Sequence, residues 1–286
     1  MSKVSAKDVA LLRKATGVGF SDCKAALEEK NGDIEEAKIF LRKKGLANAE
    51  KKGGRVAAEG IIGIQITEDF KKAVMIEQNC ETDFVAKNND FVAFVNKLAS
   101  AALNNDIQDA DKLMSEGDFE SQRQQLVLTL GENIQVRRIS HMAAEGEVVH
   151  YQHGTKIGVI VDVEGSKEVG KDIAMHIAAS NPTALSIDKL PEDIVNREKD
   201  ICLAQTKALN KPAEFIEKIM EGKLNKMLGE MCLLNQPFIK DPSKSVQQYL
   251  KESGSTVHQF VRFEVGEGIE KKQENFAEEV KKQLGD

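Results

Sequence analysis

The side chains best suited to chemistry lie in one short acidic run and one isolated histidine. Glu77, Glu81 and Asp83 are close together, and His153 is far from them in the chain. Carboxylates that are paired with a base, metal or cofactor can carry out acid–base catalysis, so an acid–base enzyme is one hypothesis. The sequence shows no such partner motif, and His153 has no serine or cysteine at nucleophile spacing. Carboxylates that face solvent and a structural histidine are the commoner explanation of such residues.

Motifs for metals and nucleotides are also missing from the sequence. The four cysteines form neither a CxxC pair nor a Cys/His cluster, which argues against zinc and redox sites. Residues 51–55, Lys-Lys-Gly-Gly-Arg, lack the Gly-Lys-Ser/Thr ending of a phosphate-binding loop. Gly266-Glu267-Gly268 is a lone GxG whose acidic centre would repel phosphate. We therefore expect no cofactor and no metal.

Length and composition favour a soluble protein of two or three domains. The chain has 286 residues, of which 41% are hydrophobic and 30% charged, enough apolar material for a sizeable core. Aromatic residues make up only 5% and tryptophan is absent, which disfavours a carbohydrate cleft or a base-stacking surface. The N-terminus lacks the apolar core of a signal peptide, and no window approaches the ~20 apolar residues of a membrane span. We expect a cytoplasmic protein that does not contact membranes.

Charge is distributed unevenly along the chain. Residues 1–55 carry 13 lysines and arginines against 8 acidic residues, whereas the whole chain has a net charge of -6. A basic N-terminal head would suit an acidic protein partner or RNA, although a solvated lysine-rich surface explains it equally well. An RNA- or ribosome-associated binding protein is therefore a second hypothesis. The negative net charge and the lack of interleaved aromatics argue against it.

The elements that must position these residues begin with three short helices in residues 5–44. Ser5 caps the first helix, Ser21 begins the second, and Asp33 caps the third. This arrangement resembles a ubiquitin-associated-type bundle, which binds other proteins through a small apolar patch, here Val18-Gly19-Phe20. Residues 45–56 are small and charged and fit a linker, in part helical, that turns at Gly53-Gly54.

The middle of the chain holds a weak internal repeat of a β-hairpin followed by a helix. The first copy has alternating apolar residues over 62–66 and 74–78, then a helix from Asp90 with one apolar stripe. The second copy starts at Val148, turns at His153-Gly154 and continues into another helix. Further strands are expected at 134–139 and 257–265, and a polar helical stretch at 107–130. Two similar α+β halves are the expected result.

A projecting helical hairpin is predicted after the second copy, from helices at 191–208 and 212–232 joined at Asn210-Lys211-Pro212. Its second helix has a methionine-rich stripe. This stripe is first of all the seam of the hairpin, and a dimer or partner surface is the alternative. A charged amphipathic helix is expected at 269–284. The fold class is α+β, with these domain boundaries: 1–54 head and linker, 55–140 first core subdomain, 141–182 with 233–286 second core subdomain, and 183–232 hairpin.

Five motifs occur in the order that is typical of the elongation factor Ts family. They are Leu12-Arg13-Lys14-Ala15-Thr16-Gly17-Val18-Gly19-Phe20-Ser21-Asp22-Cys23-Lys24-Ala25-Ala26-Leu27, Asn79-Cys80-Glu81-Thr82-Asp83-Phe84-Val85-Ala86-Lys87-Asn88, Gly131-Glu132-Asn133-Ile134, Tyr151-Gln152-His153-Gly154, and Phe260-Val261-Arg262-Phe263-Glu264-Val265-Gly266-Glu267-Gly268-Ile269. The chain resembles this family over its whole length. One departure is Ser21, because the family usually has two long apolar residues at positions 20 and 21.

The resemblance implies a translation factor that is a guanine nucleotide exchange factor and not an enzyme. Its partner would be the GTPase elongation factor Tu, GDP-bound or nucleotide-free, and no direct contact with nucleic acid is expected. A homodimer through the hairpin remains an alternative use of that element.

The resemblance also implies roles for individual residues. Residues Thr82, Asp83, Phe84 and Val85 would enter the GTPase near its Mg²⁺ and displace the ion. Contacts to the partner would come from Arg13, Val18, Phe20, Lys24 and His153. The sequence alone leaves alternatives open: Phe84 could be a core residue beside Phe91 and Phe94, and Thr82 or Asp83 could be a helix N-cap.

Overall fold

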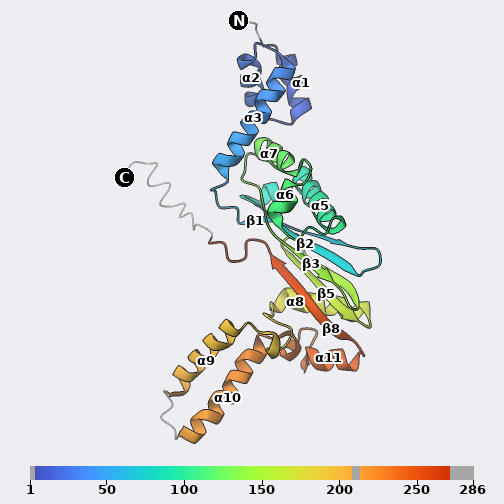
Figure 1. The fold of residues 1–286 in the computed structure, drawn as a ribbon, viewed down its shortest axis with the longest axis vertical. Coiled ribbons are helices and arrows are strands. Elements are labelled where there is room, and N and C mark those ends of the chain that lie inside the picture. Colours follow the sequence, from blue (N-terminus) through green and yellow to red (C-terminus); the bar gives the residue numbers. More distant parts are fainter. Residues whose placement is uncertain (1–3, 208–212, 271–286) are drawn as a thin grey trace.

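The computed structural model describes residues 4–207 and 213–270. The protein is elongated, with a helical head, a body built on two three-stranded sheets, and a helical hairpin at the far end from the head (Figure 1). Both sheets are antiparallel and helices cover them, so the α+β prediction is confirmed.

The head contains the three predicted helices: α1 Ala6–Thr16, α2 Phe20–Glu29 and α3 Ile34–Lys52. Ser5 and Asp33 cap α1 and α3 by accepting hydrogen bonds from backbone amides two or three residues into each helix. The second helix begins one residue before the predicted Ser21, because Gly19 has the extended backbone of an N-cap. Helix α3 runs through most of the predicted linker to Gly53.

The first half of the body is a three-stranded sheet with helices on one face. Its strands pair in the order β1-β2-β3. The helical stretch predicted at 107–130 is divided into two helices, α6 and α7. The apolar stripe of the long helix α5 is buried, as predicted. The elements are β1 Glu59–Ile66, β2 Lys72–Cys80, α4 Asp83–Ala86, α5 Asn89–Asn104, α6 Ala110–Ser115, α7 Phe119–Leu130 and β3 Gln135–Ala143.

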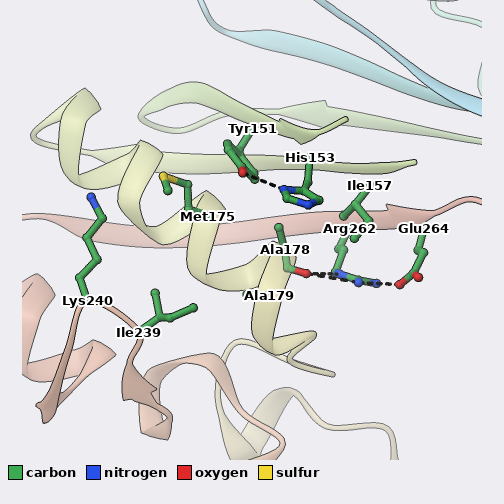
Figure 2. A pocket seen from close by; sticks show the side chains of 10 residues that line it. All are labelled: Tyr151, His153, Ile157, Met175, Ala178, Ala179, Ile239, Lys240, Arg262 and Glu264. Carbon is green, nitrogen blue, oxygen red and sulfur yellow. Dashed lines mark hydrogen bonds and ion pairs between the residues drawn. The ribbon is translucent and has the colours of Figure 1, made fainter. Parts of the chain in front are cut away.

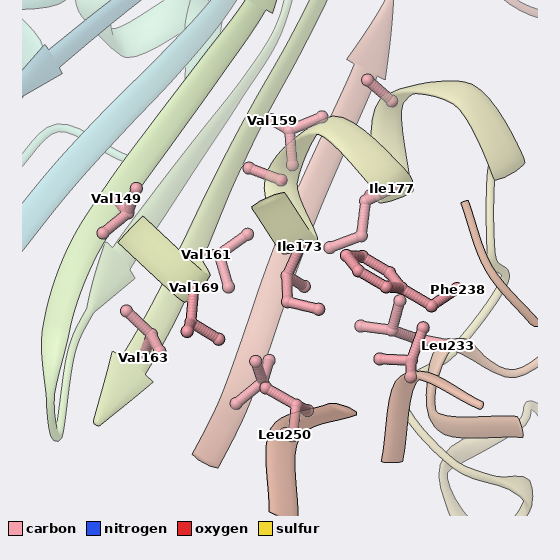
Figure 3. Packing of buried hydrophobic residues seen from close by; sticks show 14 residues of the cluster. Val149, Val159, Val161, Val163, Val169, Ile173, Ile177, Leu233, Phe238 and Leu250 are labelled. Carbon is pink, nitrogen blue, oxygen red and sulfur yellow. The ribbon is translucent and has the colours of Figure 1, made fainter. Parts of the chain in front are cut away.

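The second half repeats this plan with strand order β4-β5-β8 and helix α8 on one face. Its core joins valines of β4 and β5 to Val169, Ile173 and Ile177 of α8 and to Phe238 and Leu250 (Figure 3). The elements are β4 Glu147–His153, β5 Ile157–Glu164, α8 Lys167–Ser180, η1 Ile187–Lys189, η2 Leu233–Asn235, β6 Pro237–Phe238, β7 Asp241–Ser245, α11 Val246–Glu252 and β8 Thr256–Glu264.

The two sheets pack against each other through their inner faces. Alternation along the strands sends Ile62 and Met75 of one sheet and Ile160 of the other into a shared apolar cluster, while their neighbours face the outer helices. Gly158 permits this approach, since a Cβ at that position would lie 2.6 Å from Ile62 Cγ2. The predicted boundary at residue 140 falls inside β3, which continues pairing with β2 as far as Ala143.

The helical hairpin consists of α9 Glu192–Lys207 and α10 Ala213–Glu230, which pack on each other. At its base Ala184 and Cys232 form a parallel bridge, and the Leu233 amide donates to the Ala184 carbonyl over 2.9 Å. The chain therefore enters and leaves the hairpin at adjacent points. The helix predicted at 269–284 lies almost entirely outside the described residues.

Candidate functional site

The segment between β2 and α5 is a short loop that contains the one-turn helix α4. Thr82 is the N-cap of α4, and its hydroxyl accepts a hydrogen bond from the Val85 amide over 3.4 Å. Asn88 caps α5 immediately afterwards. Two caps within seven residues make the chain turn twice, which separates α4 from the long helix. The N-cap interpretation of Thr82 is therefore correct, and Asp83 is the first residue inside the helix.

Phe84 points into solvent with 81% of its surface exposed, more than any other large apolar residue of the described chain. Val85 and Ala86 face the opposite way and are buried at 7% and 5% exposure, in a cluster with Phe91. The interpretation of Phe84 as a core residue beside Phe91 is thus excluded. The buried side of α4 anchors this helical turn in the body, and its opposite side presents the Phe84 ring to solvent.

Glu132 holds the start of this loop in place from across the fold. One carboxylate oxygen accepts hydrogen bonds from the Glu81 and Thr82 amides over 3.0 and 2.9 Å. The other accepts from the Thr82 hydroxyl over 2.5 Å. Charge-assisted bonds of this kind are stronger than neutral ones. The loop is therefore preorganised, which reduces the entropy lost when it binds.

Asn133 extends the same support toward the head. Its backbone amide donates to Glu81 Oε1 over 2.6 Å, and its side-chain amide donates to the Arg55 carbonyl over 2.8 Å. Asn133 is almost completely buried at 1% exposure. The neighbouring Gly131 carbonyl accepts from Lys52 Nζ over 2.5 Å. The segment that follows α7 thus connects the Phe84 loop with the end of α3.

The carboxylate of Asp83 is held by Lys87, one helical turn further along, over 2.7 Å. This hydrogen bond lowers the pKa of Asp83 below its ordinary value, with smaller contributions from the charges of Lys87 and Lys156. Beneath the loop, burial raises the pKa of Cys80 to about 12, so its thiol stays protonated and donates to the Thr82 carbonyl over 3.1 Å. Cys80 is therefore a structural group and not a nucleophile.

His153 lies at the end of β4, and its Nδ1 is 3.2 Å from the Tyr151 hydroxyl. Both side chains line a pocket of about 570 Å³ between the second sheet, α8 and the turn between β6 and β7 (Figure 2). On the opposite wall Ile239 is 49% exposed, and Lys240 forms an ion pair with Asp172. The pocket is lined by Tyr151, His153, Ile157, Met175, Ala178, Ala179, Ile239, Lys240, Arg262 and Glu264.

The turn that follows His153 reaches back to the first sheet. The Thr155 carbonyl accepts a hydrogen bond from the Ile62 amide over 2.9 Å, and Lys156 pairs with Glu59 over 2.6 Å. Glu59 in turn is paired with Cys80, just before the Phe84 loop, in the register of β1 and β2. The His153 turn and the Phe84 loop therefore lie in the same region of the body, although they come from different halves.

Of the head residues predicted to contact a partner, Arg13, Phe20 and Lys24 are exposed, with Phe20 at 48%. Val18 has no exposed surface, because the turn between α1 and α2 folds it into the core of the bundle. The predicted patch at 18–20 therefore presents only Phe20, and the side chain of Val18 is withdrawn from the candidate contacts. Lys24 has Glu28 nearby at 3.7 Å on the same helix face.

The head is fixed to the body through α7. Leu128 of α7 belongs to the apolar core of the bundle, and Gln125 donates to the Thr16 carbonyl over 2.8 Å. The buried Gly45 of α3 lies against Leu128. The residues of the predicted linker are thus small because α3 packs closely against α7 there, and α3 continues through this segment.

The three carboxylates considered for acid–base chemistry do not converge on a shared space. Glu77 is fully buried between two arginines, Glu81 accepts from the Asn133 amide, and Asp83 pairs with Lys87. Within residues 4–207 and 213–270 no cluster of His, Cys, Asp and Glu could hold a metal ion. No helix among those residues has the length and apolarity to cross a bilayer.

Sequence pattern alone does not identify Glu132 and Asn133 as residues that support the site. Both belong to the Gly131–Ile134 motif, so the motif itself was the available signal. Their role required the fold, because Glu132 lies 50 residues from Thr82 in the chain.

Exposed aromatic residues on a braced loop and on a helical head, and a pocket between the second sheet and α8, are features typical of protein-binding surfaces on a modular α+β protein. Residues 81–267 match the family model described as "Elongation factor TS". Similar proteins named elongation factor Ts occur in Halorhodospira halophila, 49% identical over 99% of both chains, and in Hydrogenovibrio crunogenus, 46% identical over 97% of this chain and 96% of the relative. The relative from Legionella pneumophila strain Paris is 48% identical over 99% of both. The chain belongs to the elongation factor Ts family, and thus to the translation elongation factors of protein biosynthesis.

Proposed function

We propose that this protein binds elongation factor Tu in its GDP-bound form and promotes release of GDP by disturbing the Mg²⁺ and phosphate site. The observation that carries the proposal is Phe84, 81% exposed on a helical turn whose base is held by Glu132. An exposed aromatic ring gains on the order of 1.5–3 kcal/mol when it is fully buried. A second protein is the natural place for that burial.

The chemistry of GDP binding explains why a small wedge is sufficient. A GTPase holds GDP through backbone amides and a Mg²⁺ ion, and Mg²⁺ demands near-ideal octahedral geometry. A ring inserted between the side chains near that ion would displace its ligands by a small distance and weaken GDP binding. Asp83 supplies a carboxylate at the N-terminal end of the same helical turn, oriented by Lys87.

Thermodynamic coupling sets the requirement on affinity. If the factor lowers the affinity for GDP, then GDP lowers the affinity for the factor by the same ratio. A factor that bound the loaded and empty GTPase equally well would change nothing. The GTPase must therefore accommodate the Phe84 ring only when its nucleotide site is open, while contacts elsewhere supply affinity for both the loaded and the empty state.

Those other contacts are assigned to the head, through Arg13, Phe20 and Lys24, and to the pocket beside His153. Phe20 and Ile239 each expose about half of their surface, at 48% and 49%. Where the family usually has a second long apolar residue, at position 21, this chain has the exposed Ser21. We expect Phe20 to contribute most of the apolar contact that the head makes.

The RNA-binding alternative is less well supported. Several basic residues of the head already have partners within the protein: Lys44 pairs with Asp22 over 2.7 Å, and Lys52 donates to the Gly131 carbonyl. Arg42 donates to Ser121 over 3.2 Å. Phosphate binding would have to compete with these contacts.

The test is release of a fluorescent GDP analogue from preloaded elongation factor Tu in the presence of excess unlabelled GDP. Acceleration by sub-stoichiometric protein supports a recycling exchange factor. Binding without acceleration would overturn the proposal and favour a holding or ribosome-associated role.

A further inference from the structure

A fully buried carboxylate lies where the two halves of the body meet. Glu77 on β2 has 0% exposure. Its Oε1 accepts hydrogen bonds from the Gly266 amide over 2.8 Å and from the Asn79 side chain over 3.1 Å. Its Oε2 accepts from Arg138 Nε over 2.5 Å, and Arg137 Nη1 lies 3.1 and 3.2 Å from the two oxygens. With this many donors, the hydrogen-bonding capacity of the buried carboxylate is satisfied, and the bonds fix the direction of each partner.

The two arginines continue the connection to the chain segment that follows β8. Arg137 Nη2 donates to the Glu267 carbonyl over 2.5 Å. Arg138 Nη2 donates to the Glu264 carbonyl and to Glu267 Oε2, each over 3.1 Å. The guanidinium of Arg138 also lies 4.1 Å from the centre of the Phe263 ring. Each arginine therefore joins Glu77 in the first sheet to the end of β8 in the second.

Gly266 completes this junction. Its φ is +75°, and a Cβ there would lie 2.4 Å from the Ala58 carbonyl oxygen, so the position requires glycine. This close approach brings the Gly266 amide to Glu77. Strand β3 and the segment after β8 thus meet β2 at one carboxylate, and the residue before β1 packs against Gly266.

The junction links the two elements to which partner contacts are assigned. Strand β2, which contains Glu77, leads through Asn79 and Cys80 into the Phe84 loop. Strand β8 lies in the same sheet as β4 and β5, which carry the His153 turn. The sheets also meet through apolar side chains, whose contact is non-directional, and through hydrogen bonds between the His153 turn and Ile62. Glu77 adds a fully buried charge to these contacts.

We infer that Glu77 is a positioning residue, which fixes the Phe84 loop relative to the His153 turn so that one GTPase molecule meets both at once. The inference rests on the proposed function. Glu77 is buried and does not touch the partner, so its effect passes through the relative placement of the two contact elements. Misplacement of about 1 Å at a reacting centre can cost on the order of a hundredfold in rate.

The test uses Glu77→Gln in the full-length chain, which preserves shape but removes the charge that holds both arginines. We expect the kcat/KM of nucleotide exchange to be roughly ten- to a hundredfold lower for this variant. The control is Ile173→Val in the core of the second half, far from the junction in the fold. Both variants are assayed at equal concentrations of folded protein, so that a loss of stability alone gives no difference between them.

A double-mutant cycle with Phe84→Ala separates positioning from a general structural role. If Glu77 acts by placing Phe84, then Glu77→Gln has little further effect in the Phe84→Ala background. Equal losses in both backgrounds would overturn the inference, as would normal exchange by folded Glu77→Gln. If Glu77→Gln does not fold, Arg138→Gln, whose side chain is partly exposed, replaces it in the same cycle. A wild-type protein that fails to accelerate release would instead overturn the proposed function.

Discussion

Thr82 and Glu132 are 50 residues apart in the chain, and the Thr82 hydroxyl donates a hydrogen bond to Glu132 Oε1 over 2.5 Å. The second oxygen of Glu132 accepts from two backbone amides at the start of the same loop. A single carboxylate after α7 thus fixes the base of a helical turn whose exposed face is Phe84. The rigidity of the Phe84 turn thus comes from a residue that does not belong to the loop.

Replacing Glu132 with alanine should therefore loosen the loop without unfolding the protein. Loss of these hydrogen bonds at a partly exposed site should make local opening easier by about 1–3 kcal/mol. Hydrogen exchange at the Glu81 and Thr82 amides should become faster, and nucleotide exchange activity should fall. The control is Glu116→Ala, at an exposed position between α6 and α7. Unchanged protection of both amides would show that Glu132 does not hold the loop.

Phe84 and Phe91 offer a matched pair of substitutions. Phe91 lies inside the apolar cluster with Val85 and Ala86, whereas Phe84 points away from it into solvent. Phe84→Ala removes an exposed ring and should change the free energy of unfolding by no more than about 0.5 kcal/mol. Phe91→Ala empties a fully buried position and should cost about 3–5 kcal/mol. Urea denaturation of both variants checks this. Comparable destabilisation by the two would mean that Phe84 is packed in solution.

Lys87→Met should raise the pKa of Asp83 toward its ordinary value. The Lys87 hydrogen bond is the largest cause of the lowered pKa, so its loss lets the carboxylate take up a proton at a higher pH. An NMR titration of the Asp83 side chain measures the change. Asp69 provides the internal control, because its lowered pKa depends chiefly on Thr67 and the Lys71 amide. If the Asp83 titration stays in place while Lys87 is absent, another group must lower its pKa.

Deletion of residues 187–229 should leave a folded body. Ala184 and Cys232 already lie side by side, and a short linker can join the ends without moving them. The deleted protein should remain soluble and keep a cooperative thermal transition. Circular dichroism and scanning calorimetry provide the measurement. Aggregation of the shortened chain would show that the hairpin helps to hold the second half together.

Local periodicity predicted most of the elements. The apolar stripe of α5 and the alternation in β1 and β2 depend on neighbours a few residues apart, and the structure contains both elements. The continuation of α3 past residue 44 agrees with the expected helical linker that turns at Gly53-Gly54, but its packing was not predicted. Gly45 and Ala49 resemble linker residues in sequence, but they are small because α7 and the body pack against α3 there.

The candidate site was harder to predict because its key properties depend on contacts that are distant in sequence. Phe84 resembles Phe91 and Phe94 in the sequence, and only the separate capped turn of α4 directs it outward. Val18 adjoins the exposed Phe20, yet the tight turn places it in the core. Glu77 was considered as a catalytic acid, whereas its arginine partners lie 60 and 61 residues further along the chain.

The central claim is that the Phe84 loop causes nucleotide release. Its most direct test is the rate of GDP release from elongation factor Tu at saturating concentrations of wild-type protein and of the Asp83→Ala plus Phe84→Ala variant. We expect the variant to fold and still bind the GTPase, with release at saturation at least tenfold slower, a difference of about 1.4 kcal/mol in the barrier. Equal release rates at saturation would contradict the claim and assign the exchange activity to another part of the surface.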